Sequence, residues 1–106
     1  MEVYRLDQME KGWFVGDFSP AVLHTSDFEI AIKRYKSGDS EARHVHKVAS
    51  EITVIAEGQV EMNGRVFEEN SIILIAAGEP AEFRAITDAL TVVVKQPSVK
   101  GDKFAI

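Results

Sequence analysis

Two histidines and a glutamate lie close together in the sequence. One residue separates His44 from His46, and Glu51 follows after four more residues. In a β-strand, residues i and i+2 point to the same face, so both imidazoles would project the same way. If the chain bends at residues 48–50 and returns beside the first strand, Glu51 points at the same place. Two imidazoles and one carboxylate suit a divalent first-row metal with open positions for water or substrate.

The segments that would position these residues show the period-two alternation of β-strands. Residues 28–36 alternate between two sets of side chains, which is typical of a half-buried strand. Residues 71–76 are apolar on both faces and predict a buried strand. Further strands are expected over residues 50–56, 59–62, 65–68, 82–87 and 90–96.

Turn residues separate these runs. Asn63-Gly64 between two short strands is a strong hairpin signal, because both central residues of a type I′ turn need a positive φ. Helical periodicity is weak everywhere, and the best candidate is the short segment 3–10. Several short strands with glycine turns predict an all-β sandwich or small barrel. A closed barrel would also remove exposed sheet edges.

The stretch that contains the two histidines resembles the first motif of the cupin superfamily. That motif reads Gly, five residues, His-x-His, three or four residues, Glu, six residues, Gly. In this chain Gly38, His44, His46, Glu51 and Gly58 fill every fixed position. The resemblance implies a cupin-type jelly-roll β-barrel of two antiparallel sheets, with the barrel core at about residues 28–96. It also implies a homodimer, in which an N-terminal strand or the 12–18 segment contributes to the partner.

The second cupin motif is incomplete in this chain. Gly78, Pro80 and Phe83 hold its register, but the usual third histidine falls on Ala81, which cannot bind a metal. The adjacent Glu82 should face the other way in a strand. The resemblance therefore implies three metal ligands instead of four. Three protein ligands still hold metals in catalytic sites, whereas metal-free members of the superfamily use the barrel as a small-molecule pocket.

Arg34 and Tyr35 are candidates for binding a substrate. A guanidinium suits a carboxylate or phosphate because its planar fork matches two oxygens. The two side chains should point to opposite faces of one strand. At most one of them would line a pocket, and Arg34 would otherwise reach water at the end of the strand.

Length, composition and charge limit the other classes of function. The chain has 106 residues, 45% hydrophobic and 27% charged, which predicts one globular domain over residues 1–106. Its net charge of −5 without a basic run disfavours nucleic acid as a partner. The absence of cysteine excludes disulfides, thiolate metal sites and a cysteine nucleophile. No apolar run approaches the ~20 residues that cross a bilayer, and no signal peptide is visible, so we expect a cytoplasmic protein without a membrane partner.

Two functions remain open. The first is a small metal-dependent cupin enzyme in which Fe²⁺, Mn²⁺, Zn²⁺ or Ni²⁺ acts on a small oxygen-rich substrate, sugar-like or acidic. The second is a metal-free or non-enzymatic module that binds a small molecule or carbohydrate. Segments 12–18 and 97–103 are similar to small cupins found among polysaccharide and nucleotide-sugar genes, which favours a carbohydrate-related ligand. The sequence identifies no catalytic acid or base.

Overall fold

The computed structural model describes all 106 residues of the chain. It contains one short 3₁₀ helix and strands throughout, so no helix could cross a membrane. In chain order the elements are η1 (Leu6–Gln8), β1 (Trp13–Gly16), β2 (Leu23–His24), β3 (Glu29–Tyr35), β4 (Ser40–Val45), β5 (Ser50–Glu57), β6 (Val60–Met62), β7 (Arg65–Phe67), β8 (Ile72–Ile75), β9 (Ala81–Ala85), β10 (Ala89–Gln96) and β11 (Phe104–Ala105). The all-β prediction is confirmed, and the expected helix shrinks to η1.

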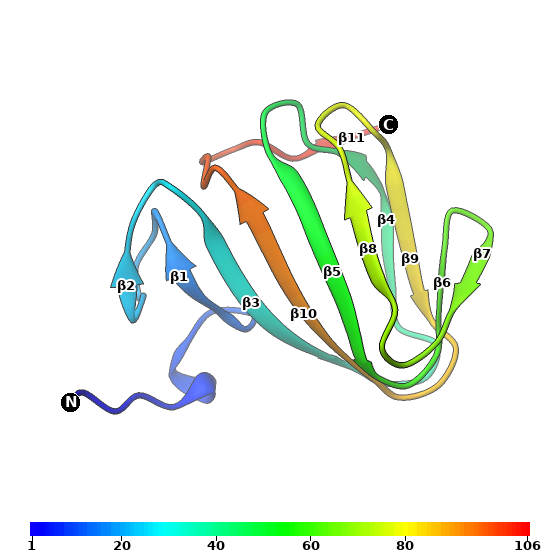
Figure 1. Cartoon of the computed structure of the whole chain (residues 1–106), viewed down its shortest axis with the longest axis horizontal. Coiled ribbons are helices and arrows are strands. Elements are labelled where there is room, and N and C mark those ends of the chain that lie inside the picture. The colour runs from blue at the N-terminus through cyan, green and yellow to red at the C-terminus, as the bar shows by residue number, and fades with distance from the viewer.

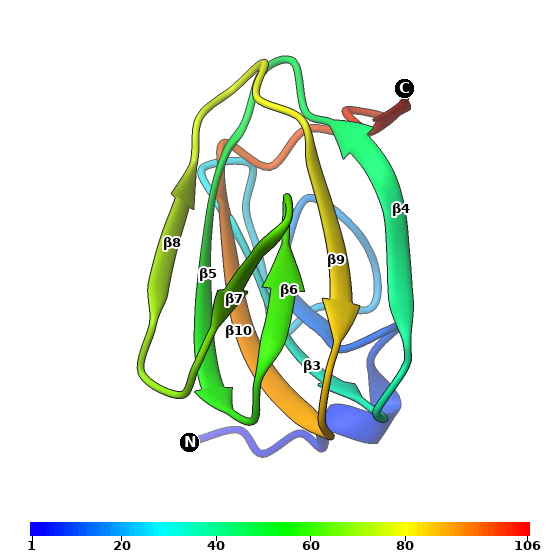
Figure 2. The same cartoon turned by 90° about the vertical axis from the view of Figure 1, so that its right-hand side faces the viewer.

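Two sheets face each other (Figures 1 and 2). The six-stranded sheet has the order β2-β1-β3-β10-β5-β8, and the five-stranded sheet has the order β11-β4-β9-β6-β7. Every pairing is antiparallel except the parallel pair of β1 and β2. No strand pair joins the sheets, so the jelly roll is confirmed but the expected closed barrel is not. Three of the four edge strands have two or three residues, which blunts the edges without closure.

The predicted Asn63-Gly64 hairpin joins β6 and β7. Met62 pairs with Arg65, and the two central residues have φ angles of 50° and 78°. Both values are positive, as a type I′ turn requires. The Asn63 side chain also donates a hydrogen bond to the Pro80 carbonyl at 2.9 Å, which ties the hairpin to the start of β9.

A compact apolar core fills part of the space between the sheets. Its largest fully buried side chains are Ile55 of β5 and Val60 of β6. The core cluster comprises Ile55, Val60, Met62, Ile75, Ala81, Phe83, Ala85 and Ala89. Alternation along β9 explains its share of the core, because every second residue from Ala81 to Ala85 is buried.

The six-stranded sheet has an unusual distribution of polarity between its two faces. Lys33, Glu51 and Lys95 point inward and line a cavity between the sheets. The residues that alternate with them are aliphatic, and Val92 pairs with both Ile32 and Val54 across three adjacent strands. The outer face of this sheet is therefore more apolar than the part of its inner face around the cavity.

Strand β8 continues this apolar outer face at the edge of the sheet. Ile72 and Leu74 are 71% and 67% exposed, whereas Ile75 is buried. The prediction that residues 71–76 form a buried strand is therefore wrong. An apolar run on both faces indicates burial on both faces only when both are covered, and nothing in the chain covers the outer face of β8.

Candidate metal centre

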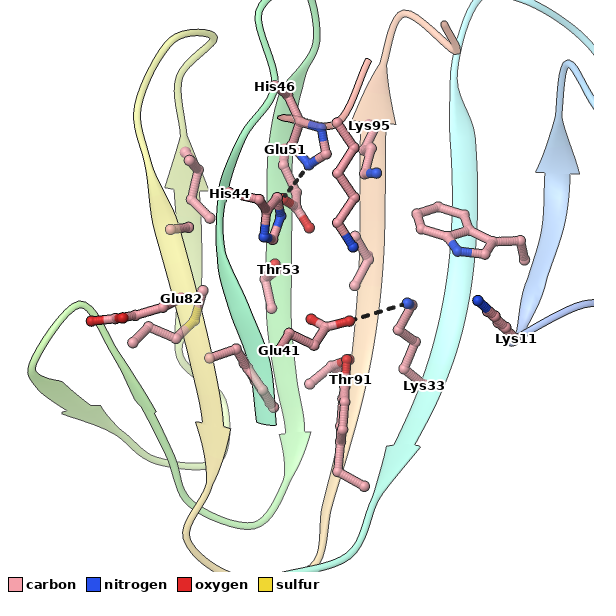
Figure 3. Close-up of a pocket in the computed structure, with 18 residues that line it drawn as sticks. Lys11, Lys33, Glu41, His44, His46, Glu51, Thr53, Glu82, Thr91 and Lys95 are labelled. Carbon is pink, nitrogen blue, oxygen red and sulfur yellow. Dashed lines mark ion pairs between the residues drawn. The ribbon is translucent and has the colours of Figure 1, made fainter. Parts of the chain in front are cut away.

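The three predicted metal ligands converge between the sheets (Figure 3). His44 belongs to β4, His46 follows that strand directly, and Glu51 lies near the start of β5. One donor atom from each residue lies within 4.8 Å of the other two. Nε2 of His46 and an oxygen of Glu51 are 3.6 Å apart. First-row metals bind nitrogen and oxygen at about 2.0–2.2 Å, so donors around one ion lie about 3–4 Å apart. The donors of His46 and Glu51 already have this spacing.

Hydrogen bonds orient both imidazole rings. Nδ1 of His44 donates to the Ala42 carbonyl at 2.9 Å, and Nδ1 of His46 donates to the Asp102 carbonyl. Because a carbonyl only accepts, each Nδ1 carries the proton and each Nε2 keeps a free lone pair. Metal-binding histidines in proteins are held in the same way.

Nε2 of His46 is the buried polar atom that best fits a metal. The residue is buried, and this nitrogen has no hydrogen-bond partner. A buried polar atom without a partner costs free energy unless a ligand or ion satisfies it. Burial lowers the pKa of His46, although its bond to the Asp102 carbonyl opposes this. The ring is thus kept in the neutral form that a metal binds.

The C-terminal segment holds the turn between the two halves of the site. The Asp102 carboxylate accepts hydrogen bonds from the backbone N–H groups of Lys47, Val48 and Ala49, at 2.8–3.2 Å. Burial alone would raise the pKa of Asp102, but these backbone donors outweigh that effect and lower it. Asp102 therefore fixes the turn that brings Glu51 back beside His46.

Ala81 takes the place of a fourth ligand. It pairs with His44 across β4 and β9, is buried, and lines the cavity. Its methyl group gives the cavity an apolar wall where the resemblance would place an imidazole. The neighbouring Glu82 is exposed, and its carboxylate points away from His44 and Glu51 (Figure 3).

The cavity beside the three ligands has a volume of about 270 Å³. Tyr35 lines it, with its ring 4.5 Å from that of Phe83. Burial and the nearby Glu41 raise the pKa of Tyr35, so its phenol stays protonated. Arg34 does not line this cavity, because alternate residues of β3 face opposite sides. It is exposed and borders a separate surface depression.

Other cavity residues escaped prediction. Lys95 and Trp13 also line the cavity, although no pattern in the sequence marks them as site residues. Thr53, Lys33 and Thr91 line it as well. The alternation of each strand gives two faces but does not say which face is the inner one. The role of Asp102 leaves no local signal in the sequence at all.

Comparison with known proteins identifies the fold. No family model and no curated protein matches the sequence. An uncharacterised double-stranded β-helix protein from Klebsiella pneumoniae is similar over 97% of this chain and 90% of its own, with a TM-score of 0.71 and 19% identity. A cupin-superfamily sugar phosphate isomerase from Silicibacter pomeroyi matches 69% of this chain and 52% of its own, with a TM-score of 0.63 and 21% identity.

Oxalate decarboxylase from Bacillus subtilis, described with Mn(II) centres, is a third similar structure. It matches 76% of this chain but only 24% of its own length, with a TM-score of 0.64 and 19% identity. All three similarities concern the arrangement of strands. The chain has the double-stranded β-helix fold of the cupins.

Proposed function

We propose that the chain is a small metal-dependent enzyme that acts on an oxygen-rich molecule in the cavity between its sheets. His44, His46 and Glu51 would hold one divalent transition metal ion. The observation that carries the proposal is the buried Nε2 of His46, which faces the other two donors without a partner. Metal centres in a cupin-fold neighbour support the same use of the fold.

A metal bound there would act as a Lewis acid on a carbonyl or hydroxyl oxygen of the substrate. The chain's own residues would bind and orient that substrate. Tyr35 holds its phenol proton at the cavity wall, where it can donate a hydrogen bond. The core residue Phe83 packs against the ring and limits its motion.

Metal content tests the proposal. The protein is purified without a chelating tag, and its metals are measured by mass spectrometry. We expect close to one equivalent of Fe, Mn, Zn or Ni, lost in His44→Ala and in Glu51→Ala. His24→Ala is the matched control, because His24 is exposed and its imidazole is paired with Asp17, away from the three ligands. Folded variants of His44 and Glu51 that retain the metal would refute the site.

A non-enzymatic binding module is the second candidate, favoured by the methyl group of Ala81 where a fourth ligand would lie. Three ligands bind a metal less tightly than four, and the cavity itself can hold a small molecule. The two functions differ in turnover. If metal-loaded protein binds small acids or sugars and leaves each of them unchanged, the binding module is correct.

We also propose that two copies pair through the outer face of the six-stranded sheet. That face is aliphatic across β3, β10, β5 and β8, and Ile72 and Leu74 at its edge are exposed. Apart from Arg34 near its end the face is uncharged, and largely aliphatic faces pack against like faces in a twofold dimer. Leu74→Lys should convert a dimer to a monomer in light scattering. Val66→Lys on the other sheet is the control and should leave the dimer intact, because Val66 is also exposed but lies outside the proposed interface. A wild-type protein that is monomeric in solution would overturn the proposed pairing.

A further inference from the structure

Lysines gather on the cavity wall around the three candidate metal ligands, and Lys95 of β10 pairs directly with Glu51 of β5. Lys33 of β3 and Lys95 of β10 project into the cavity, and Lys11 reaches it from the N-terminal segment (Figure 3). Lys103 of the C-terminal segment lines it as well. These four are a third of the chain's 12 basic residues, in a protein whose net charge is −5. An acidic chain thus places a local concentration of positive charge inside the cavity that holds the three candidate metal ligands.

The two strand lysines are largely withdrawn from water. Their side chains are only 19% and 15% exposed. Lys33 lies 3.5 Å from Glu41, and Lys95 lies 3.5 Å from Glu29. An ammonium group has three donors, so one contact at this distance leaves most of its hydrogen-bonding capacity unused. Burying a charge in this way is costly unless further partners satisfy it.

Trp13 forms the surface on which both lysines rest. Its ring centroid is 5.2 Å from Nζ of Lys33 and 4.8 Å from Nζ of Lys95. Both distances are within cation–π range. The aromatic ring therefore holds two ammonium groups near one place without neutralising either charge.

The carboxylates of the cavity do not balance the lysines. Glu51 belongs to the metal site, and Glu82 points away from it. Glu41 and Glu29 remain against four ammonium groups, and Glu29 also accepts a hydrogen bond from the Ser98 hydroxyl at 2.7 Å. A divalent metal would add further positive charge. The cavity thus suits an anion better than a neutral polyol.

A second polar atom points to the same ligand. Thr91 lines the cavity and is only 1% exposed. Its hydroxyl oxygen is buried and has no hydrogen-bond partner. A hydroxyl can donate to an oxygen anion. Thr91 and His46 are the only residues whose buried side-chain polar atoms lack a partner, and both line this cavity.

We infer that the cavity binds a small organic acid with at least two anionic groups. One group would face the metal ligands, and another would accept hydrogen bonds from Lys33, Lys95 and Thr91. This inference rests on the proposed function for the metal-facing end of the ligand. It narrows the substrate class from oxygen-rich molecules in general to organic anions.

Malonate and its neutral analogue malonamide test the inference. Trp13 is the sole tryptophan, so its fluorescence reports binding beside both lysines, and calorimetry measures the same constants independently. We expect metal-loaded protein to bind malonate at least tenfold more tightly than malonamide. Binding should also weaken as ionic strength rises. Equal affinity for the two compounds would overturn the inference.

Lysine variants locate the anion. Lys33→Met and Lys95→Met should each weaken malonate at least tenfold, whereas Lys36→Met should not, because Lys36 borders a separate depression. The double variant Lys33→Met/Glu41→Gln removes the pair together, which guards against misfolding caused by an unpaired glutamate. If malonate binds these cavity variants as it binds the wild type, the lysines are not its site.

Metal content in the same samples separates this inference from the proposed function. Lysine variants that keep the metal content of the wild type but no longer bind malonate support both the metal site and the anion site. Protein that carries no metal yet binds malonate in a lysine-dependent manner refutes the metal enzyme and supports the anion site. Protein that carries the metal and binds neither compound refutes the anion site alone.

Discussion

The backbone carbonyl of Asp102 accepts a hydrogen bond from Nδ1 of His46, although 56 residues separate the two in the sequence. The carboxylate of the same aspartate caps the turn that follows His46. One C-terminal residue thus sets both the orientation of an imidazole ring and the path of the chain toward Glu51.

Asp102→Ala should weaken metal binding without removing a metal ligand. The backbone carbonyl remains, but the N–H groups of Lys47 and Ala49 lose their acceptor and the turn loosens. Changes to groups that orient ligands typically cost about 10–100-fold in metal affinity. Competition with a chelator measures this loss. Asp7→Ala, on the exposed η1 segment, should have no effect; unchanged affinity in the Asp102 variant would show that the turn is held by other contacts.

Ala81→His should add a ligand and tighten metal binding. Ala81 lies directly opposite His44 and faces the cavity, so an imidazole there projects toward the other three donors. We expect at least a tenfold gain in affinity, measured by the same competition. Glu82→His is the matched control, because residue 82 faces outward. Equal effects of the two substitutions would mean that the site is not where the three ligands place it.

Tyr35 should keep its proton beyond the pH at which a free tyrosine loses it. Its pKa is raised by burial and then by Glu41, so above about pH 10 the unfolded chain releases a proton that the folded chain retains. Folding then binds a proton, and the free energy of unfolding falls as pH rises through that range. Phenolate absorbance should show one late transition that disappears in Tyr35→Phe. The chain has two tyrosines. If Tyr35→Phe removes the earlier of the two phenolate transitions, Tyr35 is not the tyrosine with the raised pKa.

Gly58→Ala should destabilise the fold more than Gly38→Ala. Both glycines have a positive φ, 88° and 93°. A Cβ at residue 58 would lie 2.2 Å from the Asp88 carbonyl oxygen, whereas a Cβ at residue 38 meets nothing within 4 Å. Backbone strain costs both variants about 1–2 kcal/mol, and the clash adds about 1–3 kcal/mol at residue 58. Urea denaturation measures both, and equal losses would contradict the packing at Gly58.

Local patterns in the sequence were enough to predict much of this fold. Alternation placed β3 and the strands from β5 to β10 within a few residues, and Asn63-Gly64 placed the β6–β7 hairpin, whereas β1, β2, β4 and β11 were not predicted from alternation. The spacing of His44, His46 and Glu51 predicted their convergence, because strand geometry alone aims the two histidines the same way. These features depend on neighbours within one strand or one turn.

Which face of each strand points inward was harder to predict. The alternation of β3 left open whether Arg34 or Tyr35 would line a pocket, and the structure turns Lys33 and Tyr35 inward and Arg34 outward. The usual rule that apolar faces point to the core fails here because the inner face holds a polar cavity. The prediction that β8 is buried was wrong for a related reason, because no other part of the chain covers its outer face.

The sequence by itself determined most of the strand segments, the hairpin turn with positive φ, and a three-ligand cluster in which Ala81 replaces the usual third histidine. Only the tertiary structure decided which faces of the strands look inward, that Lys95 and Trp13 join the cavity, and that Asp102 orients His46. The physical reason is the distance along the sequence over which each interaction acts. Strand alternation and turn geometry act between close neighbours, whereas the charge and hydrogen-bond partners of the cavity come from segments that only the packing of two sheets brings together.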